Sequence, residues 1–290
     1  MNLLELLLLA AIWGASFLFM RIAAPEFGPI PLMALRVAIA ALVLAPVLRT
    51  ASARQQLRSH LWPLCVIGVT NSAVPFCLLA YASLSVNAGM DSVLNATTPL
   101  WAALIASIAF HGSMSRSQMF GLLTGFAGVI VLVHDTLVAG TPGVPLAIAA
   151  ALIAALFYGF AVNYSKRSLA GVQPSVVAAG SQLFAALALW PLALTCWPRH
   201  PVNLATWGYV VVLGVVCTAL AYLLYFRLIA RAGATYAASV TFLIPVFGVL
   251  WGAVCLGEKL TPSMFVGCAI VLSGTAIASG KFSGFRLHRA

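Results

Sequence analysis

Long apolar stretches, separated by short breaks of Gly, Pro and charged residues, follow one another along the whole chain. Each stretch is too long for a strand, and the strands of a membrane barrel alternate apolar and polar positions. About 20 apolar residues cross a bilayer as a helix, which satisfies its own backbone hydrogen bonds in lipid. We therefore predict an all-α integral membrane protein with ten transmembrane helices. Their expected bounds are 2–20, 30–48, 62–84, 88–110, 116–134, 144–164, 174–197, 203–226, 233–256 and 262–279.

Composition excludes several classes of protein. Of the 290 residues, 63% are apolar and 7% are charged, whereas soluble domains are about 45–50% apolar and about 25% charged. A water-soluble enzyme and a disulfide-stapled secreted module are both excluded. The net charge of +10 could suggest a nucleic-acid partner, but the basic residues fall between apolar runs, as in membrane topology. The expected partner is the lipid bilayer, and no nucleic acid.

The distribution of Lys and Arg predicts the orientation. If the ten helices alternate in direction, eleven basic residues lie on the side of the two termini and three on the opposite side. By the positive-inside rule, both termini face the cytoplasm, and residues 281–290 form a basic cytoplasmic tail. The expected location is the cell (inner) membrane. The eleven residues are Arg49, Arg54, Arg58, Arg116, Lys166, Arg167, Arg227, Arg231, Lys281, Arg286 and Arg289.

The chain carries an internal repeat. An offset of 145 to 146 residues superposes Gly on Gly and Pro on Pro, which weighs more than matches of Ala or Leu in an apolar chain. The units are 1–137 and 142–280, with five predicted helices each, so the second copy enters the membrane from the opposite side. Inverted repeats are typical of secondary transporters, although a duplication can also simply build a large bundle. The matched pairs include Gly14 and Gly159, Pro29 and Pro174, Gly68 and Gly214, Pro99 and Pro245, and Gly121 and Gly267.

Enzyme motifs are absent from the sequence. There is no GxxxxGK[ST] phosphate loop and no HExxH zinc motif, and all five histidines fall at predicted helix ends or in loops. No His lies at the centre of an apolar stretch, where it could activate a serine nucleophile. We expect no catalytic residue, no metal and no cofactor.

Residues 243–261, which read LIPVFGVLWGAVCLGEKLT, resemble a known signature. Together with Gly267 and Gly274 they are similar to the EamA-type branch of the drug/metabolite transporter superfamily. The first half keeps Pro99, Gly121 and Gly128 but has His111 and Gly112 where that family places a Glu. The resemblance implies a ten-helix transporter, most similar to exporters of amino acids, aromatic ones included, and of other metabolites.

Pro99 and Pro245 are the first candidates for substrate binding. Each falls inside a predicted helix at mirror-related positions, and a Pro there frees a backbone carbonyl. Mirror-placed interruptions in two halves point to a transporter's central site. The alternative is that neighbouring groups satisfy the freed carbonyl and the Pro merely bends the helix.

Aromatic and polar positions extend this set. Trp13 maps onto Tyr158 at the offset of 145, and a Trp or Tyr deep in the membrane needs a hydrogen-bond partner. Packing between helices, or facing lipid, is the alternative for each aromatic residue. Asp91, Asn95 and Thr98 form a stripe along one helix face, expected to point into the bundle. The substrate-binding candidates are Trp13, Asn95, Pro99, Trp101, Tyr158, Asn163, Tyr222, Thr241 and Pro245.

Arg36 is the one basic residue well inside a predicted span. It is within reach of Asp91, Glu26 or helix-end carbonyls, so we favour a structural clamp over substrate binding. Asp91 and Arg36 are candidates for coupling or for an ion pair, and Asp91 has the alternative of capping a helix. The small residues Gly121, Gly125 and Gly128 suit close helix packing or a homodimer.

Together these observations predict a secondary transporter that exports small neutral or zwitterionic metabolites, chiefly amino acids, by alternating access. Phosphorylated solutes would need several basic groups in the membrane, and only Arg36 is available. Two alternatives stay open: an exporter of lipophilic cationic drugs, which favours an essential carboxylate, and a passive channel or scaffold.

Overall fold

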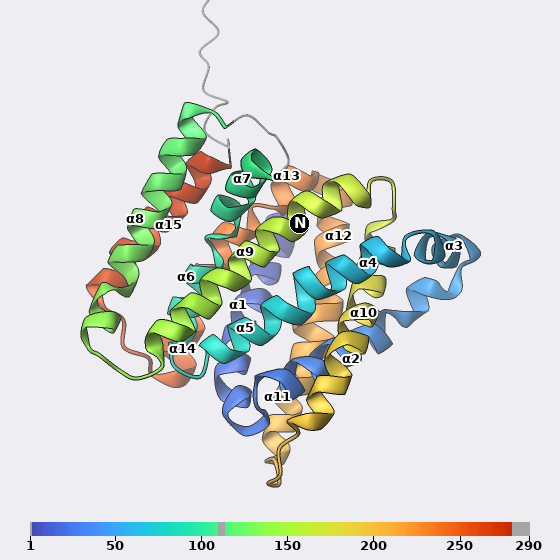
Figure 1. Ribbon diagram of the computed structural model, residues 1–290, viewed down its shortest axis with the longest axis horizontal. Coiled ribbons are helices and arrows are strands. Elements are labelled where there is room, and N and C mark those ends of the chain that lie inside the picture. Colours follow the sequence, from blue (N-terminus) through green and yellow to red (C-terminus); the bar gives the residue numbers. More distant parts are fainter. Residues whose placement is uncertain (1, 110–113, 280–290) are drawn as a thin grey trace, which may run out of the picture.

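Every regular element in the described part of the chain is a helix (Figure 1). The computed structural model describes residues 2–109 and 114–279. The predicted basic tail, 281–290, and the departure at His111 and Gly112 lie outside these residues.

The described residues of the first half form eight α-helices and two other helical segments. They are α1 (Asn2–Phe27), α2 (Pro29–Leu44), the 3₁₀ helix η1 (Ala45–Arg49), α3 (Ala51–Ser59), α4 (Leu61–Gly68), the π-helix η2 (Val69–Ala73), α5 (Val74–Ala82), α6 (Ala88–Asn95), α7 (Thr98–Ile108) and α8 (Arg116–Val138).

The second half follows a similar order. Its elements are α9 (Val144–Ser168), α10 (Pro174–Thr195), α11 (Leu204–Gly214), the π-helix η3 (Val215–Leu220), α12 (Ala221–Ala232), α13 (Ala234–Ala237), α14 (Val240–Leu256) and α15 (Pro262–Ala278).

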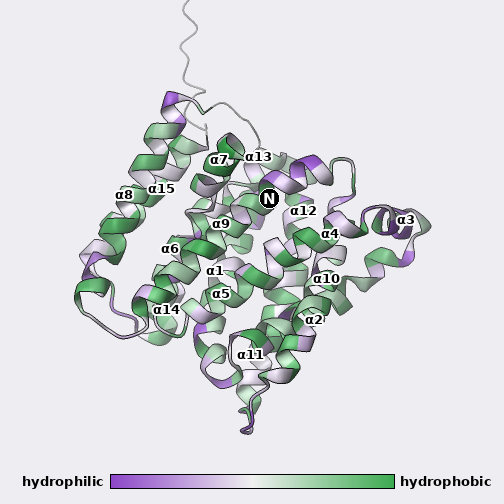
Figure 2. Cartoon of the chain, in the orientation of Figure 1, coloured by the Kyte–Doolittle hydropathy of each residue, from purple (hydrophilic) through white to green (hydrophobic). Residues whose placement is uncertain are grey.

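Across residues 2–109 and 114–279, seven continuous helical stretches are long and apolar enough to cross a membrane. In addition, α14 and α15 are apolar but shorter. The predicted helix at 88–110 differs, because it divides into α6 and α7 around Ala96 and Thr97. The short helix α3 was not predicted; it is polar and stands at one edge of the molecule (Figure 2). The seven spanning stretches are 2–27, 29–49, 61–82, 116–138, 144–168, 174–195 and 204–232.

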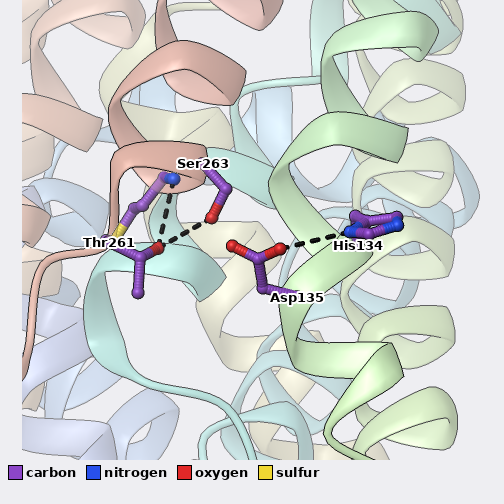
Figure 3. Close-up of polar contacts among 5 residues, drawn as sticks. His134, Asp135, Thr261 and Ser263 are labelled. Atoms are coloured by element: carbon purple, nitrogen blue, oxygen red, sulfur yellow. Dashed lines mark hydrogen bonds and ion pairs between the residues drawn. The ribbon is translucent and has the colours of Figure 1, made fainter.

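Side-chain caps set several helix ends. Ser115 and Gln118 form a reciprocal capping box at the start of α8, which satisfies two otherwise unpaired amides. At the start of α15, the hydroxyl of Thr261 accepts from the amide of Met264 at 3.3 Å and meets the hydroxyl of Ser263 at 2.8 Å (Figure 3). Ser115 and Thr261 are 146 residues apart, so both copies begin their last helix at equivalent positions.

Helices α8 and α15 lie side by side at one edge of the bundle (Figure 1). A Cβ on Gly128 would stand 2.6 Å from the amide nitrogen of Val271, and one on Gly267 would stand 2.7 Å from Cα of Leu132. The glycines predicted for packing or dimerisation are therefore used within the chain. The outward faces are apolar, as Ile130 on α8 and Val266 on α15 illustrate with exposed fractions of 68% and 52%. Such faces suit contact with lipid rather than water.

Two π-helical segments face the centre of the bundle from opposite halves. Segment η2 packs against α10, and η3 packs against α2. Their first residues, Val69 and Val215, are 146 positions apart. Single π-helical turns within α-helices occur frequently at functional sites. The centre of the bundle is therefore the region in which to look for a site.

Candidate substrate cavity

A cavity of about 440 Å³ lies between the helices, within the range of about 300–1,000 Å³ typical of small-molecule sites. Residues from both halves line it, including both π-helical segments. Its wall is mostly apolar and aromatic, with a few polar groups.

Seven of the eleven candidate residues line this cavity. The lining includes Trp13, Arg36, Asn95, Pro99, Tyr158, Tyr222 and Thr241. Trp101, Asn163, Pro245 and Asp91 are not among its lining residues.

Aromatic side chains form one wall. The ring of Trp13 meets those of Tyr222 and Tyr225, with centroids 6.4 Å and 5.4 Å apart. Asn71 donates to the hydroxyl of Tyr222 at 3.3 Å, and it lines the cavity as well. Asn71 and Tyr225 were not singled out from the sequence. A signal existed for Asn71, because it is an amide within an apolar run, as Asn95 is.

Arg36 is buried, with 4% of its surface exposed, and its surroundings differ from those predicted. Nε donates to the hydroxyl of Thr218 at 2.9 Å, and Cζ lies 4.0 Å from the ring centroid of Phe76. It forms no ion pair with a carboxylate in residues 2–109 or 114–279. Of the two carboxylates predicted within reach, Asp91 accepts from Ser83, and Glu26 accepts from the amide of Asn203.

The polar stripe predicted along one helix is interrupted. Asn95 and Thr98 line the cavity, whereas Asp91 is fully buried and accepts from the hydroxyl of Ser83 at 3.0 Å. The helix predicted to carry the stripe divides, because α6 ends at Asn95 and α7 begins at Thr98. The expectation of one continuous helix face is therefore wrong, although the division falls between the two residues that line the cavity. The other oxygen of Asp91, Oδ1, finds no hydrogen-bond partner among the described residues.

Pro99 explains this break. It has no amide hydrogen, so it cannot bond to the carbonyl of Asn95 four residues earlier. That carbonyl instead accepts from the hydroxyl of Thr98 at 2.7 Å. The side-chain oxygen Oδ1 of Asn95 is buried and has no hydrogen-bond partner among the described residues. The acceptor without a partner at this break is thus the side-chain oxygen of Asn95 rather than its backbone carbonyl oxygen.

The two prolines are not structurally equivalent. Pro99 stands in the first turn of α7, where a Pro is tolerated, whereas Pro245 is buried inside α14. In the second half the break falls at Ala238 and Ser239, between α13 and α14. The two prolines are mirror-related in the sequence, but the helix breaks of the two halves fall at different positions of the repeat.

Trp101 and Asn163 lie where α7 crosses α9. Asn163 donates to the carbonyls of Ala102 and Gly159, each at 2.9 Å. The ring of Trp101 packs against Phe126 with centroids 5.0 Å apart. These contacts show both residues in helix packing, and neither lines the cavity.

Two contacts outside the aromatic wall bear on access to the cavity. At one end its lining reaches the exposed Lys166, near the end of α9. Elsewhere, the carboxylate of Glu258 accepts from the amide of Ala88 at 2.9 Å, which joins the segment after α14 to the start of α6. Among the described residues that line the cavity, Arg36 and Lys166 are basic and none is acidic.

Comparisons with known proteins identify the family. The model of the EamA-like transporter family matches residues 2–134 and 145–280. The chain belongs to this family. It is a multi-pass membrane protein and a transporter rather than an enzyme.

Relatives match over nearly the whole chain. A probable terminal-alkyne amino-acid exporter of Streptantibioticus cattleyicolor is 23% identical and covers 97% of this chain and 94% of its own. A probable amino-acid metabolite efflux pump of Salmonella typhimurium is 23% identical, covering 98% and 95%. The uncharacterized inner membrane transporter YedA of Escherichia coli is 26% identical, covering 93% and 88%. One crystal structure shares the fold, with a TM-score of 0.67, 20% identity and 98% of each chain covered.

Proposed function

We propose that this EamA-family transporter exports small neutral or zwitterionic metabolites, chiefly amino acids and among them aromatic ones. It works as a secondary transporter by alternating access, in the inner membrane, with both termini in the cytoplasm. Ten transmembrane segments form two inverted five-helix repeats, residues 1–137 and 142–280.

The observation that carries this proposal is the cavity itself. Its aromatic wall, with Trp13, Tyr222 and Tyr225 in contact, suits an apolar side chain. The free acceptor Asn95 Oδ1 suits an ammonium group. Two relatives of this chain are named as a probable amino-acid exporter and a probable amino-acid metabolite efflux pump, which agrees with such a solute.

Helix boundaries support the inverted repeat. Helices α6 and α13 begin at Ala88 and Ala234, and α8 and α15 begin at Arg116 and Pro262, each pair 146 positions apart. The family model also matches one segment in each half. Five segments per copy reverse the direction of the second copy, which is the arrangement that alternating access uses.

We infer that the cavity opens on the side of Lys166, because this exposed residue is part of its lining. The positive-inside rule assigns Lys166 to the cytoplasm. A solute would enter from there, and outward release would require the contact between Glu258 and Ala88 to separate.

Counterflow in proteoliposomes tests the proposal. Vesicles loaded with unlabelled L-phenylalanine or L-leucine should accumulate the labelled amino acid, and accumulation should saturate. Trp13→Ala should raise the KM about two- to tenfold, because an aromatic contact contributes about 0.5–1.5 kcal/mol. Trp62→Ala, an exposed Trp outside the cavity, is the matched control and should leave KM unchanged. Absence of saturable flux for every amino acid would contradict the proposal.

The same assay separates the alternatives. A passive channel shows no trans-stimulation, whereas a carrier does. An exporter of lipophilic cations would need an acidic group in its cavity, and none lines it among the described residues.

A further inference from the structure

Arg36 places a positive charge in the wall of the cavity, and no carboxylate among the described residues forms an ion pair with it. Burial of an unpaired charge is unfavourable, so a protein retains one where it has a role. We propose that Arg36 binds the carboxylate of the transported solute. This inference rests on the proposed function and deepens it, because it restricts the substrates to solutes that carry a carboxylate and gives each end of an amino acid its own partner.

The guanidinium of Arg36 is held in place without using all of its hydrogen-bond donors. Thr218 gives its own hydroxyl proton to the carbonyl of Leu213 at 2.8 Å, so its oxygen is free to accept from Nε of Arg36. The ring of Phe76 covers one face. The group is therefore oriented by one hydrogen bond and one ring contact before a solute arrives, which reduces the entropy lost on binding.

The remaining contacts of Arg36 are weak. Within the described part of the chain, the partners of Nη1 are the thioether sulfurs of Met20 at 3.8 Å and Met33 at 4.0 Å, and a thioether is a poor acceptor. A guanidinium matches a carboxylate with two parallel, charge-assisted hydrogen bonds. A solute carboxylate would therefore supply much stronger acceptors than the protein does.

The second half shows that a charge is not needed to hold these helices together. Gln182 on α10 donates to the hydroxyl of Ser72 in η2 at 2.9 Å. An offset of 146 carries Ser72 to Thr218, and the offset of 145 between α2 and α10 carries Arg36 to Ser181, the residue before Gln182. The two contacts therefore join equivalent segments of the repeat through neighbouring positions. A neutral amide makes the helix contact in one half, whereas only the Arg36 pair lines the cavity. The charge therefore has a role beyond the clamp that the sequence favoured.

The polar groups of the cavity accommodate the other end of an amino acid. Asn95 Oδ1 is an acceptor without a partner among the described residues, and it suits the solute ammonium. No described lining residue is acidic, so a solute with a positive charge and no carboxylate meets Arg36 without compensation. Lipophilic cations should therefore be rejected.

The test compares three solutes that differ only at their ends: L-phenylalanine, L-phenylalaninamide and 3-phenylpropionate, with L-leucine and L-leucinamide in parallel. Each competes with a labelled amino acid in counterflow by the wild-type carrier. We expect the amides to compete at least about tenfold more weakly than the amino acids, as losing hydrogen bonds to a charged group implies. Arg36→Gln should weaken competition by the amino acids at least about tenfold, and the variant should no longer prefer amino acids over their amides.

Further variants separate binding from folding. Arg36→Lys keeps the charge but loses the paired donors, so it should retain only part of the preference. Thr218→Val keeps Arg36 and removes the acceptor that orients it, so it should reduce the preference as well. Arg54→Gln, on the exposed helix α3, is the charge-matched control and should change nothing. The Thr218 result decides the matter should the Arg36 variants fail to fold.

The outcomes are distinguishable. If the wild type carries no amino acid, the proposed function fails and this inference fails with it. If it carries amino acids and amides equally, or if folded Arg36→Gln keeps the preference, the proposed function stands and this inference is overturned.

Discussion

Gln182 donates to Ser72 at 2.9 Å, and Arg36 donates to Thr218 at the same distance. In both pairs a side chain from the second helix of one half reaches a π-helical segment of the other half. The repeat carries Ser72 to Thr218 and Arg36 to Ser181, so the two halves join the same segments through neighbouring positions, with a charge in one copy and a neutral amide in the other.

Removing the neutral pair should affect stability rather than specificity. Ser72→Ala leaves Nε2 of the fully buried Gln182 without an acceptor, which should lower the free energy of unfolding by about 1–3 kcal/mol. Thermal unfolding in detergent measures the loss, and Ser59→Ala on the exposed helix α3 is the control. A change in preference between amino acids and their amides would contradict the structural role assigned to this pair.

Glu258 should stabilise closure of one end of the cavity. Glu258→Ala removes the acceptor for the amide of Ala88, so the outward-open form should gain population. The measurement is labelling of Ser16→Cys, a cavity position, by an impermeant thiol reagent added from each side, in a background without other cysteines. Labelling from the side opposite Lys166 should increase.

The matched control for Glu258 is Asp135→Asn. Asp135 is an exposed carboxylate that pairs with His134 at 3.1 Å on α8 (Figure 3). Its loss should leave labelling from both sides as in the wild type. Equal labelling of the Glu258 variant and the wild type would contradict a role in closure.

Asp91 should be dispensable for amino-acid flux. It lies outside the lining of the cavity, and Asn at this position can still accept from Ser83. Asp91→Asn should therefore retain counterflow of L-phenylalanine within about twofold, since a change of that size is about 0.4 kcal/mol. Loss of flux in a folded variant would instead assign Asp91 the coupling role that the sequence left open.

Gly159 should tolerate no side chain. A Cβ there would stand 2.7 Å from the amide nitrogen of Ala102, in the backbone of the crossing helix α7. Gly159→Ala should destabilise the protein by about 1–3 kcal/mol through overpacking. Gly208→Ala is the matched control, because nothing lies within 4 Å of a Cβ at that helical position. It should be neutral or stabilising by up to about 1 kcal/mol, since Ala favours a helix. Equal melting temperatures for the two variants would contradict the close crossing.

The sequence by itself determined that the chain is helical and spans a membrane, because a spanning helix is recognised from the apolar residues of one continuous segment. Most of the candidate residues that it indicated line the cavity, since a polar or aromatic side chain in an apolar run must find a partner away from lipid. Trp13, Asn95, Tyr158 and Tyr222 were identified in this way. The repeat was readable because Gly and Pro recur at one offset.

Only the tertiary structure decided which of these residues meet. Asp91 and Trp101 follow the same sequence pattern as Asn95 and Trp13, yet they lie outside the cavity lining, because Asp91 bonds to Ser83 and Trp101 packs against Phe126. The surroundings of Arg36 were likewise undetermined, since Thr218 lies 182 positions away and its placement depends on how α2 packs against η3. Side-chain partners across helices depend on rotation and contact between distant segments, which no local pattern records.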